Sequence, residues 1–287
     1  MPATAGLARR IVRSGAQRFL LWFLLIAAFV FCYLPTLIWL NEKYGLQDSY
    51  YSHGYLIPFI TGYLIYRKRA ELEKIERSSS RSGLWVIVGA LLIHVLGVTG
   101  DVNFVSAFSV VLYLVGISLF LLGREFTRAI RFPLLFLCFM CPLPTAIIDV
   151  VAIPLKSTAT GIATVIIDRM GVPHLRDGFI IHFAHSSFVV GTPCNGLRSL
   201  ISFLALGLLF LYCADTASWK KGLFLAFIPP MAVFLNGVRI AVLLLIAYRF
   251  GAQAASTESY LHDASGMAVF LVGLAIMGLF LRRIHEA

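Results

Sequence analysis

Charged residues are scarce in this chain. Only 13% of its 287 residues are Asp, Glu, Lys or Arg, whereas soluble domains carry about 25%. Apolar residues make up 59% of the chain and the mean hydropathy is +0.86, which excludes a water-soluble fold. Acidic residues are fewer than basic ones, with 14 Asp and Glu against 24 Lys and Arg. The basic residues lie in short segments between apolar runs, so their excess indicates membrane topology and no nucleic-acid partner.

The N-terminus lacks the features of a cleaved secretory signal. Four arginines precede an apolar stretch from Phe19 to Leu40, which is too long for a secretory core region and has no small-residue cleavage site at its end. We interpret residues 1–18 as a basic cytoplasmic N-terminus and the stretch after it as an uncleaved signal anchor. Residues 19–287 are then expected to form a single polytopic membrane domain.

The cysteines lack the pattern of a disulfide framework. There are five of them, and all but Cys194 lie within or at the ends of apolar runs. The pair Cys138 and Cys141 forms a CxxC sequence inside an apolar run, which favours a packing role over a redox role. Cys194 alone lies in a polar loop.

Long apolar runs dominate the rest of the chain. A bilayer core about 30 Å thick needs about 20 apolar residues per helix. The candidate runs lie near 19–40, 55–66, 83–100, 103–122, 132–148, 197–213, 223–250 and 266–281. The sequence therefore predicts an all-α integral membrane protein, a polytopic bundle of about eight transmembrane helices.

The distribution of Lys and Arg predicts the orientation of these helices. With both termini in the cytoplasm, the inner segments hold 17 of these residues and the outer segments hold four. Short cytoplasmic loops are the ones enriched in Lys and Arg. We therefore expect a multi-pass protein of the inner or plasma membrane whose long loop, residues 149–196, faces the periplasmic or extracellular side.

This outer loop contains a stretch, residues 146–170, that is apolar enough to compete as a ninth span. It carries Pro154, Lys156 and several hydroxyl residues at its centre, and an extra crossing would move four basic residues to the outer side. An amphipathic helix lying on the outer interface is the better interpretation. After it, residues 178–191 are rich in β-branched and aromatic residues around a polar turn, which predicts a β-hairpin leading to Cys194.

Three places combine ionisable or nucleophilic residues with a membrane setting, where such residues are costly and are functional candidates by default. The first is Cys194, placed just before an apolar helix where the helix dipole and Arg198 would favour a thiolate. The alternative is an inert small residue at a helix boundary. The second is His262, which can act as an acid and a base near neutral pH; it can equally cap a helix together with Asp263.

Arg239 is the third place, and it is the hardest to explain as structure. No acidic residue lies between Trp219 and Gly251, so a compensating anion must come from another segment or from a substrate. A straight span ending at Phe250 would place Arg239 about 16 Å below the outer end. Either the span ends near Val238 and the helix projects beyond the membrane, or a water-filled cleft reaches Arg239.

A metal site is a weaker alternative. His182 and His185, with His262 and Cys194, are possible zinc ligands. In the predicted hairpin, however, the spacing of His182 and His185 places them on opposite faces or around a turn, which is poor geometry for one ion. We therefore expect no metal and no cofactor.

The three places together resemble the exosortase/archaeosortase family of membrane sorting enzymes. The resemblance is carried by Pro193-Cys-Asn-Gly-Leu-Arg-Ser199, Asn236-Gly-Val-Arg239 and His262-Asp-Ala-Ser-Gly266, in this order on one topology. The stretches 51–58 and 132–144 are similar to earlier segments of that family, so the match runs from about residue 50 to 281. Asn195 stands where many members carry a serine, a tolerable change because Asn also caps helices.

The resemblance implies a cysteine transpeptidase in which Cys194 is the nucleophile, His262 the proton shuttle and Arg239 the group that stabilises the oxyanion or orients the thiolate. Supporting or substrate-binding roles fall to Arg198, Asn195, Asn236, Asp263 and His53. The implied substrates are secreted proteins with a short sorting motif, a C-terminal transmembrane helix and a basic tail, cleaved through a thioester that an amine or water resolves. The alternative is a transporter, channel or non-catalytic assembly component of envelope polysaccharide export, in which Arg239 binds an anionic substrate.

Overall fold

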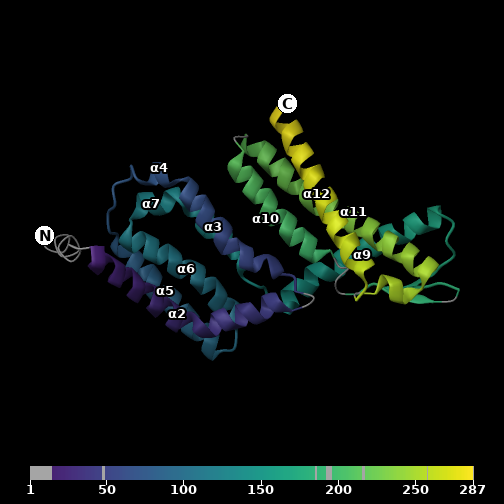
Figure 1. Ribbon diagram of the computed structural model, residues 1–287, viewed down its shortest axis with the longest axis horizontal. Helices are drawn as coiled ribbons and strands as arrows, with labels where there is room; N and C mark the ends of the chain where they lie inside the picture. Colours follow the sequence, from purple (N-terminus) through teal and green to yellow (C-terminus); the bar gives the residue numbers. More distant parts are fainter. Residues whose placement is uncertain are drawn as a thin grey trace. The chain divides into compact units, whose positions relative to one another are not determined.

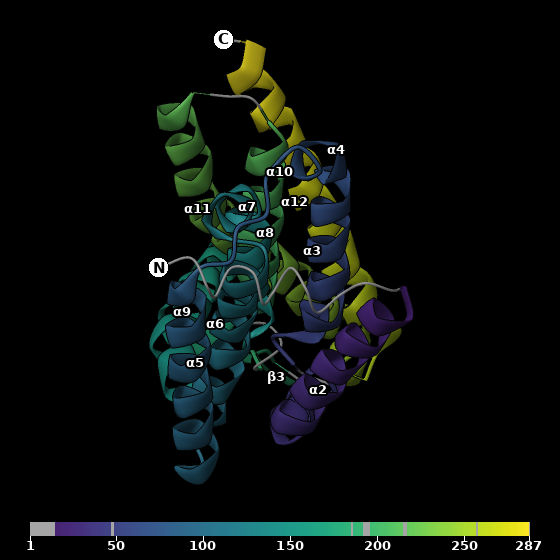
Figure 2. The same cartoon turned by 90° about the vertical axis from the view of Figure 1, so that its left-hand side faces the viewer.

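The computed structural model describes residues 15–46, 49–184, 186–191, 196–214, 217–256 and 258–286. The chain divides into two compact units, Met1–Pro142 and Leu143–Ala287, and each is described by itself. Figures 1 and 2 show the helices that make up almost all of both units.

The first unit is built from helices of very different lengths. The long ones are α2, α5 and α6, and the shorter ones follow or connect them (Figure 1). In chain order they are α2 (Gly15–Gly45), η1 (Ser52–Tyr55), α3 (Leu56–Arg67), α4 (Arg69–Leu72), α5 (Arg81–Thr99), α6 (Asn103–Leu121), α7 (Arg124–Ala129), α8 (Arg131–Phe136) and η2 (Leu137–Met140).

Helices α5 and α6 form a close antiparallel pair because small residues line their interface. A Cβ added at Gly97 would lie 2.8 Å from the backbone nitrogen of Ser106, and one at Gly116 would lie 2.9 Å from that of Ile87. Such contacts let two helix backbones approach, and this packing is typical of helices in membranes.

A buried polar cluster ties α2 to this pair. Nε2 of His94 contacts the carbonyl of Cys32 at 2.9 Å, and Nδ1 contacts Oγ of Ser106 at 2.7 Å, which in turn contacts Thr36. Because a carbonyl only accepts, Nε2 carries the proton and Nδ1 accepts from Ser106. Pro35, inside α2, has no N–H to donate to a carbonyl one turn back. Nε2 of His94 supplies an additional side-chain donor in this turn of α2. His94 is thus a buried polar residue that joins α5 to α2 and α6.

The second unit contains four long helices and a small sheet. Helices α10, α11 and α12 run alongside one another, and α9 packs along α11 (Figures 1 and 2). Its elements are α9 (Thr145–Arg169), β1 (Leu175–Asp177), β2 (Ile180–His182), β3 (Ser187–Val189), α10 (Leu197–Cys213), α11 (Ser218–Phe250), η4 (Ala252–Ala255) and α12 (Tyr260–Glu286).

The sheet is antiparallel, with the order β1-β2-β3. Strands β2 and β3 form the hairpin predicted for residues 178–191, with Ile180 opposite Val189 and His182 opposite Ser187. Strand β1 adds a third strand that the sequence did not indicate. The inward residues Ile181 and Phe188 join a core with the second half of α9 and the last third of α11. The sheet therefore covers one end of the α9–α11 pair.

The membrane class is confirmed by the helices themselves. Within the described residues, α5, α6, α9, α11 and the segment Ala252–Ile284 are long and apolar enough to cross a membrane by length and composition. Two shorter apolar helical segments, Arg131–Met140 and Leu197–Cys213, accompany them. The protein is an all-α, multi-pass membrane protein with a small sheet.

One predicted span is wrong in its extent. The run 132–148 does not form one helix, because helical structure ends at Met140 and resumes at Thr145. The break contains Pro142 and Pro144, which cannot donate a backbone hydrogen bond inside a helix. Counting apolar residues alone misses this interruption.

Helix α9 (Thr145–Arg169) covers the stretch 146–170 and begins one residue before it. By length and composition it could also cross a membrane, which is the alternative set aside above. At its polar centre, the ammonium of Lys156 lies 4.0 Å from the centre of the Phe179 ring, and Nη2 of Arg176 donates to the carbonyl of Ser157 at 3.4 Å. These contacts explain how polar residues are accommodated in an otherwise apolar helix. Placement of α9 on the outer surface stays a prediction.

Candidate functional site

The start of α10 is held against the middle of α11. Gly196 is the residue before α10 and has a φ of 78°, the left-handed region in which a side chain is strained. A Cβ at this position would lie 2.9 Å from Nδ2 and 3.0 Å from Cγ of Asn236. Gly196 therefore lets the chain turn tightly and touch Asn236, which is buried in α11. Cys194 is two residues upstream of this contact.

Arg239 lies one helical turn beyond Asn236 and reaches across to α12. Its Nε donates to Oγ of Ser265 and its Nη2 donates to the carbonyl of His262, each at 3.4 Å. Oγ of Ser265 in turn donates to the same His262 carbonyl at 2.7 Å. Residues three apart on a helix are neighbours on its surface, so Asn236 and Arg239 connect the start of α10 to the first turns of α12.

His262 is buried, with 4% of its surface exposed. Nδ1 of His262 lies 3.4 Å from the carbonyl of Ala255, and because a carbonyl only accepts, Nδ1 is the donor. In a neutral imidazole this leaves Nε2 as the atom that accepts a proton. The adjacent Asp263 is exposed, so the two side chains lie on different faces of α12.

The stretch of α11 that carries Arg239 is fixed from its other side by α9. A Cβ at Gly237 would lie 2.7 Å from Cγ2 of Ile162 and 3.2 Å from the carbonyl of Ala159. This close approach leaves α11 little freedom to rotate or slide at the level of Arg239.

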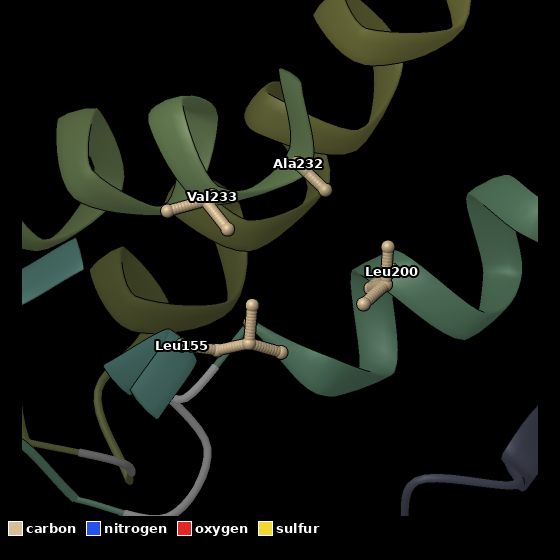
Figure 3. Close-up of a pocket in the computed structure, with 5 residues that line it drawn as sticks. Leu155, Leu200, Ala232 and Val233 are labelled. Carbon is tan, nitrogen blue, oxygen red and sulfur yellow. The ribbon is translucent and has the colours of Figure 1, made fainter. Parts of the chain in front are cut away.

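An apolar hollow borders the contact between Gly196 and α11. It is shallow and partly open to the surroundings, and it has no interior space large enough for a water molecule. Figure 3 shows the side chains of Leu155 from α9, Leu200 from α10, and Ala232 and Val233 from α11 arranged around it. Gly196 therefore borders this hollow and also contacts Asn236.

The remaining predicted site residues have different positions. Cys194 and Asn195 lie outside the described residues. Arg198 is half-buried in the first turn of α10. His53 lies in η1 of the first unit, where its ring centre is 6.0 Å from that of Tyr51, and its role at the site stays a prediction.

Metal ligation is not indicated by the part of the chain that the structure describes. There, no three His, Cys, Asp or Glu side chains come together in a way that would hold a metal ion. His182 is exposed on β2, and His185 lies outside the described residues.

Ser265 and Gly266 belong to the sequence motif that begins at His262, but the sequence alone assigned them no role. The structure adds that both touch the guanidinium of Arg239. A signal for this contact was available, because positions three and four after His262 fall on the same face of a helix as His262 itself. What the sequence did not contain was the identity of the residue that packs there.

The fold and this arrangement define a multi-pass membrane protein with a compact polar cluster formed by the start of α10, the middle of α11 and the first turns of α12. Residues 39–279 match the family model described as transmembrane exosortase (Exosortase_EpsH), so the chain belongs to the transmembrane exosortase family. Comparison with curated proteins and with solved structures finds no match. Family membership supports a membrane sorting transpeptidase in general.

Proposed function

We propose that this protein is a cysteine transpeptidase that cleaves the C-terminal sorting signal of secreted proteins through a thioester on Cys194. One observation carries the proposal. Gly196 rests on Asn236, and Arg239, one turn further along α11, binds the helical turn that begins at His262. These contacts support the proposal because Cys194 is only two residues before Gly196 in the sequence.

The lengths of α11 and α12 support a site at the membrane boundary. Nζ of Lys220 donates to the carbonyl of Ile284 at 2.9 Å, while Arg239 contacts Ser265. Lys220 and Arg239 are 19 positions apart in α11, and Ser265 and Ile284 are 19 positions apart in α12. Nineteen residues correspond to about 29 Å along a helix axis. A bilayer core is about 30 Å thick. The two contacts are thus spaced as expected for the two faces of the membrane, with Arg239 at one of them.

The position of the sheet also supports a location of Arg239 at the membrane boundary. Beyond this residue, α11 packs against β2 and β3 through Ile240, Leu243 and Leu244. Strand β1 carries the exposed residues Arg176 and Asp177 at the edge of the sheet. Open sheet edges and exposed charges do not occur in the hydrocarbon region. We therefore favour a span that ends near Val238 and a projecting helix end over a water-filled cleft, and the Lys/Arg distribution assigns this end to the outer side.

The proposed chemistry uses the Cys194 thiol, the Arg239 guanidinium and the His262 imidazole. The Cys194 thiolate attacks the carbonyl carbon of the scissile amide, and the resulting oxyanion is held by the directed donors of Arg239. His262 gives a proton to the leaving amine as the C–N bond breaks, which leaves a thioester. An amine or water then attacks the thioester, His262 accepts the proton of this nucleophile, and the Cys194 sulfur leaves as thiolate.

The test is processing of a tailed substrate. We expect co-expression with secreted proteins that carry a C-terminal transmembrane helix and basic tail to yield products with a new C-terminus, detected by mass spectrometry. Cys194→Ala should abolish this product while the protein remains inserted. Cys194→Ser should be nearly as inactive, because a hydroxyl is a far weaker nucleophile without a strong base.

A matched control is Cys213→Ala, which removes an exposed cysteine at the other end of α10 and should leave processing unchanged. Full processing by Cys194→Ala would refute the transpeptidase proposal. It would favour instead a transporter or assembly role, in which the thiol is dispensable.

A further inference from the structure

The guanidinium of Arg239 lies on a turn of α12 made of small residues. Nε contacts Oγ of Ser265 at 3.4 Å, and a Cβ added at Gly266 would lie 3.1 Å from Nη2 and 3.2 Å from Cζ. A methyl group at position 266 would therefore require the guanidinium to shift by a few tenths of an ångström. Ser265 and Gly266 together form a surface, here called the arginine seat, on which the planar group rests.

The hydrogen bonds of the seat have a fixed direction. A serine hydroxyl has one proton, and that of Ser265 goes to the carbonyl of His262 at 2.7 Å. The oxygen of Ser265 therefore accepts from Nε of Arg239, and Nη2 donates to the same carbonyl at 3.4 Å. The direction of the guanidinium is thus coupled to the peptide group of His262.

We propose that Ser265 and Gly266 are positioning residues that fix the direction of the Arg239 guanidinium. This inference rests on the proposed function, because it assigns to Arg239 a task at the Cys194 thiolate. Its structural basis is the contact of Gly196 with Asn236, one helical turn from Arg239. Without the seat, the long side chain keeps its charge but loses its direction.

The experiment measures the thiolate directly and needs no substrate. The full-length protein in membranes is alkylated with iodoacetamide across a range of pH, and the rate at Cys194 is followed by mass spectrometry of its peptide. Since only the thiolate reacts, the profile reports an apparent pKa for Cys194. Five variants are compared with the wild type: Arg239→Gln, Ser265→Ala, Ser265→Thr, Gly266→Ala and Gly278→Ala.

A neighbouring positive charge lowers a pKa by about 1–3 units, so Arg239→Gln should raise the apparent pKa of Cys194 by about one unit or more. Ser265→Ala and Gly266→Ala should shift it in the same direction by about half as much, because the charge remains but is misdirected. Ser265→Thr keeps the hydroxyl and should match the wild type. Gly278→Ala is the control for Gly266→Ala, because a Cβ at Gly278 of α12 meets nothing within 4 Å.

The decisive comparison is the double variant Arg239→Gln with Ser265→Ala. If Ser265 acts through Arg239, the double variant should have the profile of Arg239→Gln alone. Equal shifts from Ser265→Ala with and without Arg239 would overturn the inference, as would a wild-type profile for either Ser265→Ala or Arg239→Gln. If Gly266→Ala is not inserted, Ser265→Ala decides. A protein that alkylates as expected but processes no substrate would contradict the proposed function and leave the seat supported.

Discussion

Replacing Gly196 by alanine tests whether its contact with Asn236 holds the Cys194 segment in place. Two separate costs are expected. Alanine in the left-handed region costs about 1–2 kcal/mol. In addition, the new Cβ would lie 2.9–3.2 Å from the side chain of Asn236, and forcing an extra carbon into a packed site costs about 1–3 kcal/mol. Gly196→Ala should therefore destabilise the protein by about 2–5 kcal/mol.

Gly171 provides a matched control, because its φ is 72° and a Cβ there meets nothing within 4 Å. Gly171→Ala should show the backbone cost alone. Asparagine tolerates the left-handed conformation, so Gly171→Asn should be nearly neutral, whereas Gly196→Asn should still be destabilised by its contact with Asn236. The difference between the two positions isolates the contact.

The assay has two parts. Thermal unfolding of the detergent-purified variants gives the order of stabilities, and processing of a tailed substrate at matched membrane levels gives the activity. Because a displacement of about 1 Å can cost roughly 100-fold in rate, Gly196→Ala should lose most processing under conditions where it remains folded. Equal losses of stability for Gly171→Ala and Gly196→Ala would show that the Asn236 contact contributes nothing and would refute this account of the site.

Three further predictions concern the roles of charge, proton transfer and topology. Arg239→Lys preserves the charge but not the planar fork of donors, so we expect this variant to lose most processing at a normal membrane level. Arg198→Lys should have a milder effect. Near wild-type processing by Arg239→Lys would show that Arg239 acts only as a counter-charge. His262→Ala should remove most of the rate and the pH dependence near neutrality, and an unchanged pH profile would assign His262 to capping. A membrane-impermeant thiol reagent should label Cys194 in sealed cells and not a cysteine introduced at Ser79, so labelling of Ser79→Cys would contradict the topology.

Sequence reasoning was most accurate where the signal was local. The run 197–213 coincides with α10, because Gly196 marks its start and apolar residues continue without a helix breaker. The hairpin of residues 178–191 follows from β-branched and aromatic residues on both sides of a short polar turn and appears as β2 and β3. The run 132–148 failed because hydropathy counts apolar residues and ignores Pro142 and Pro144, which end the helical segment.

The sequence by itself determined the membrane class, because so few charged residues cannot cover a soluble surface, and it singled out Cys194, Arg239 and His262 as residues that are costly or unusual in their settings. It could not show which residues accompany them. Arg239 and Ser265 are 26 positions apart, and Gly196 and Asn236 are 40 apart.

Only the tertiary structure decided that these pairs touch, because the contacts depend on how α10, α11 and α12 pack and not on spacing within any one helix. The structure also adds the observation that supports the proposed level of Arg239 in the membrane. A hydropathy profile treats α11 as one long apolar helix, whereas the structure covers its last third with a sheet whose open edge and exposed charges require water.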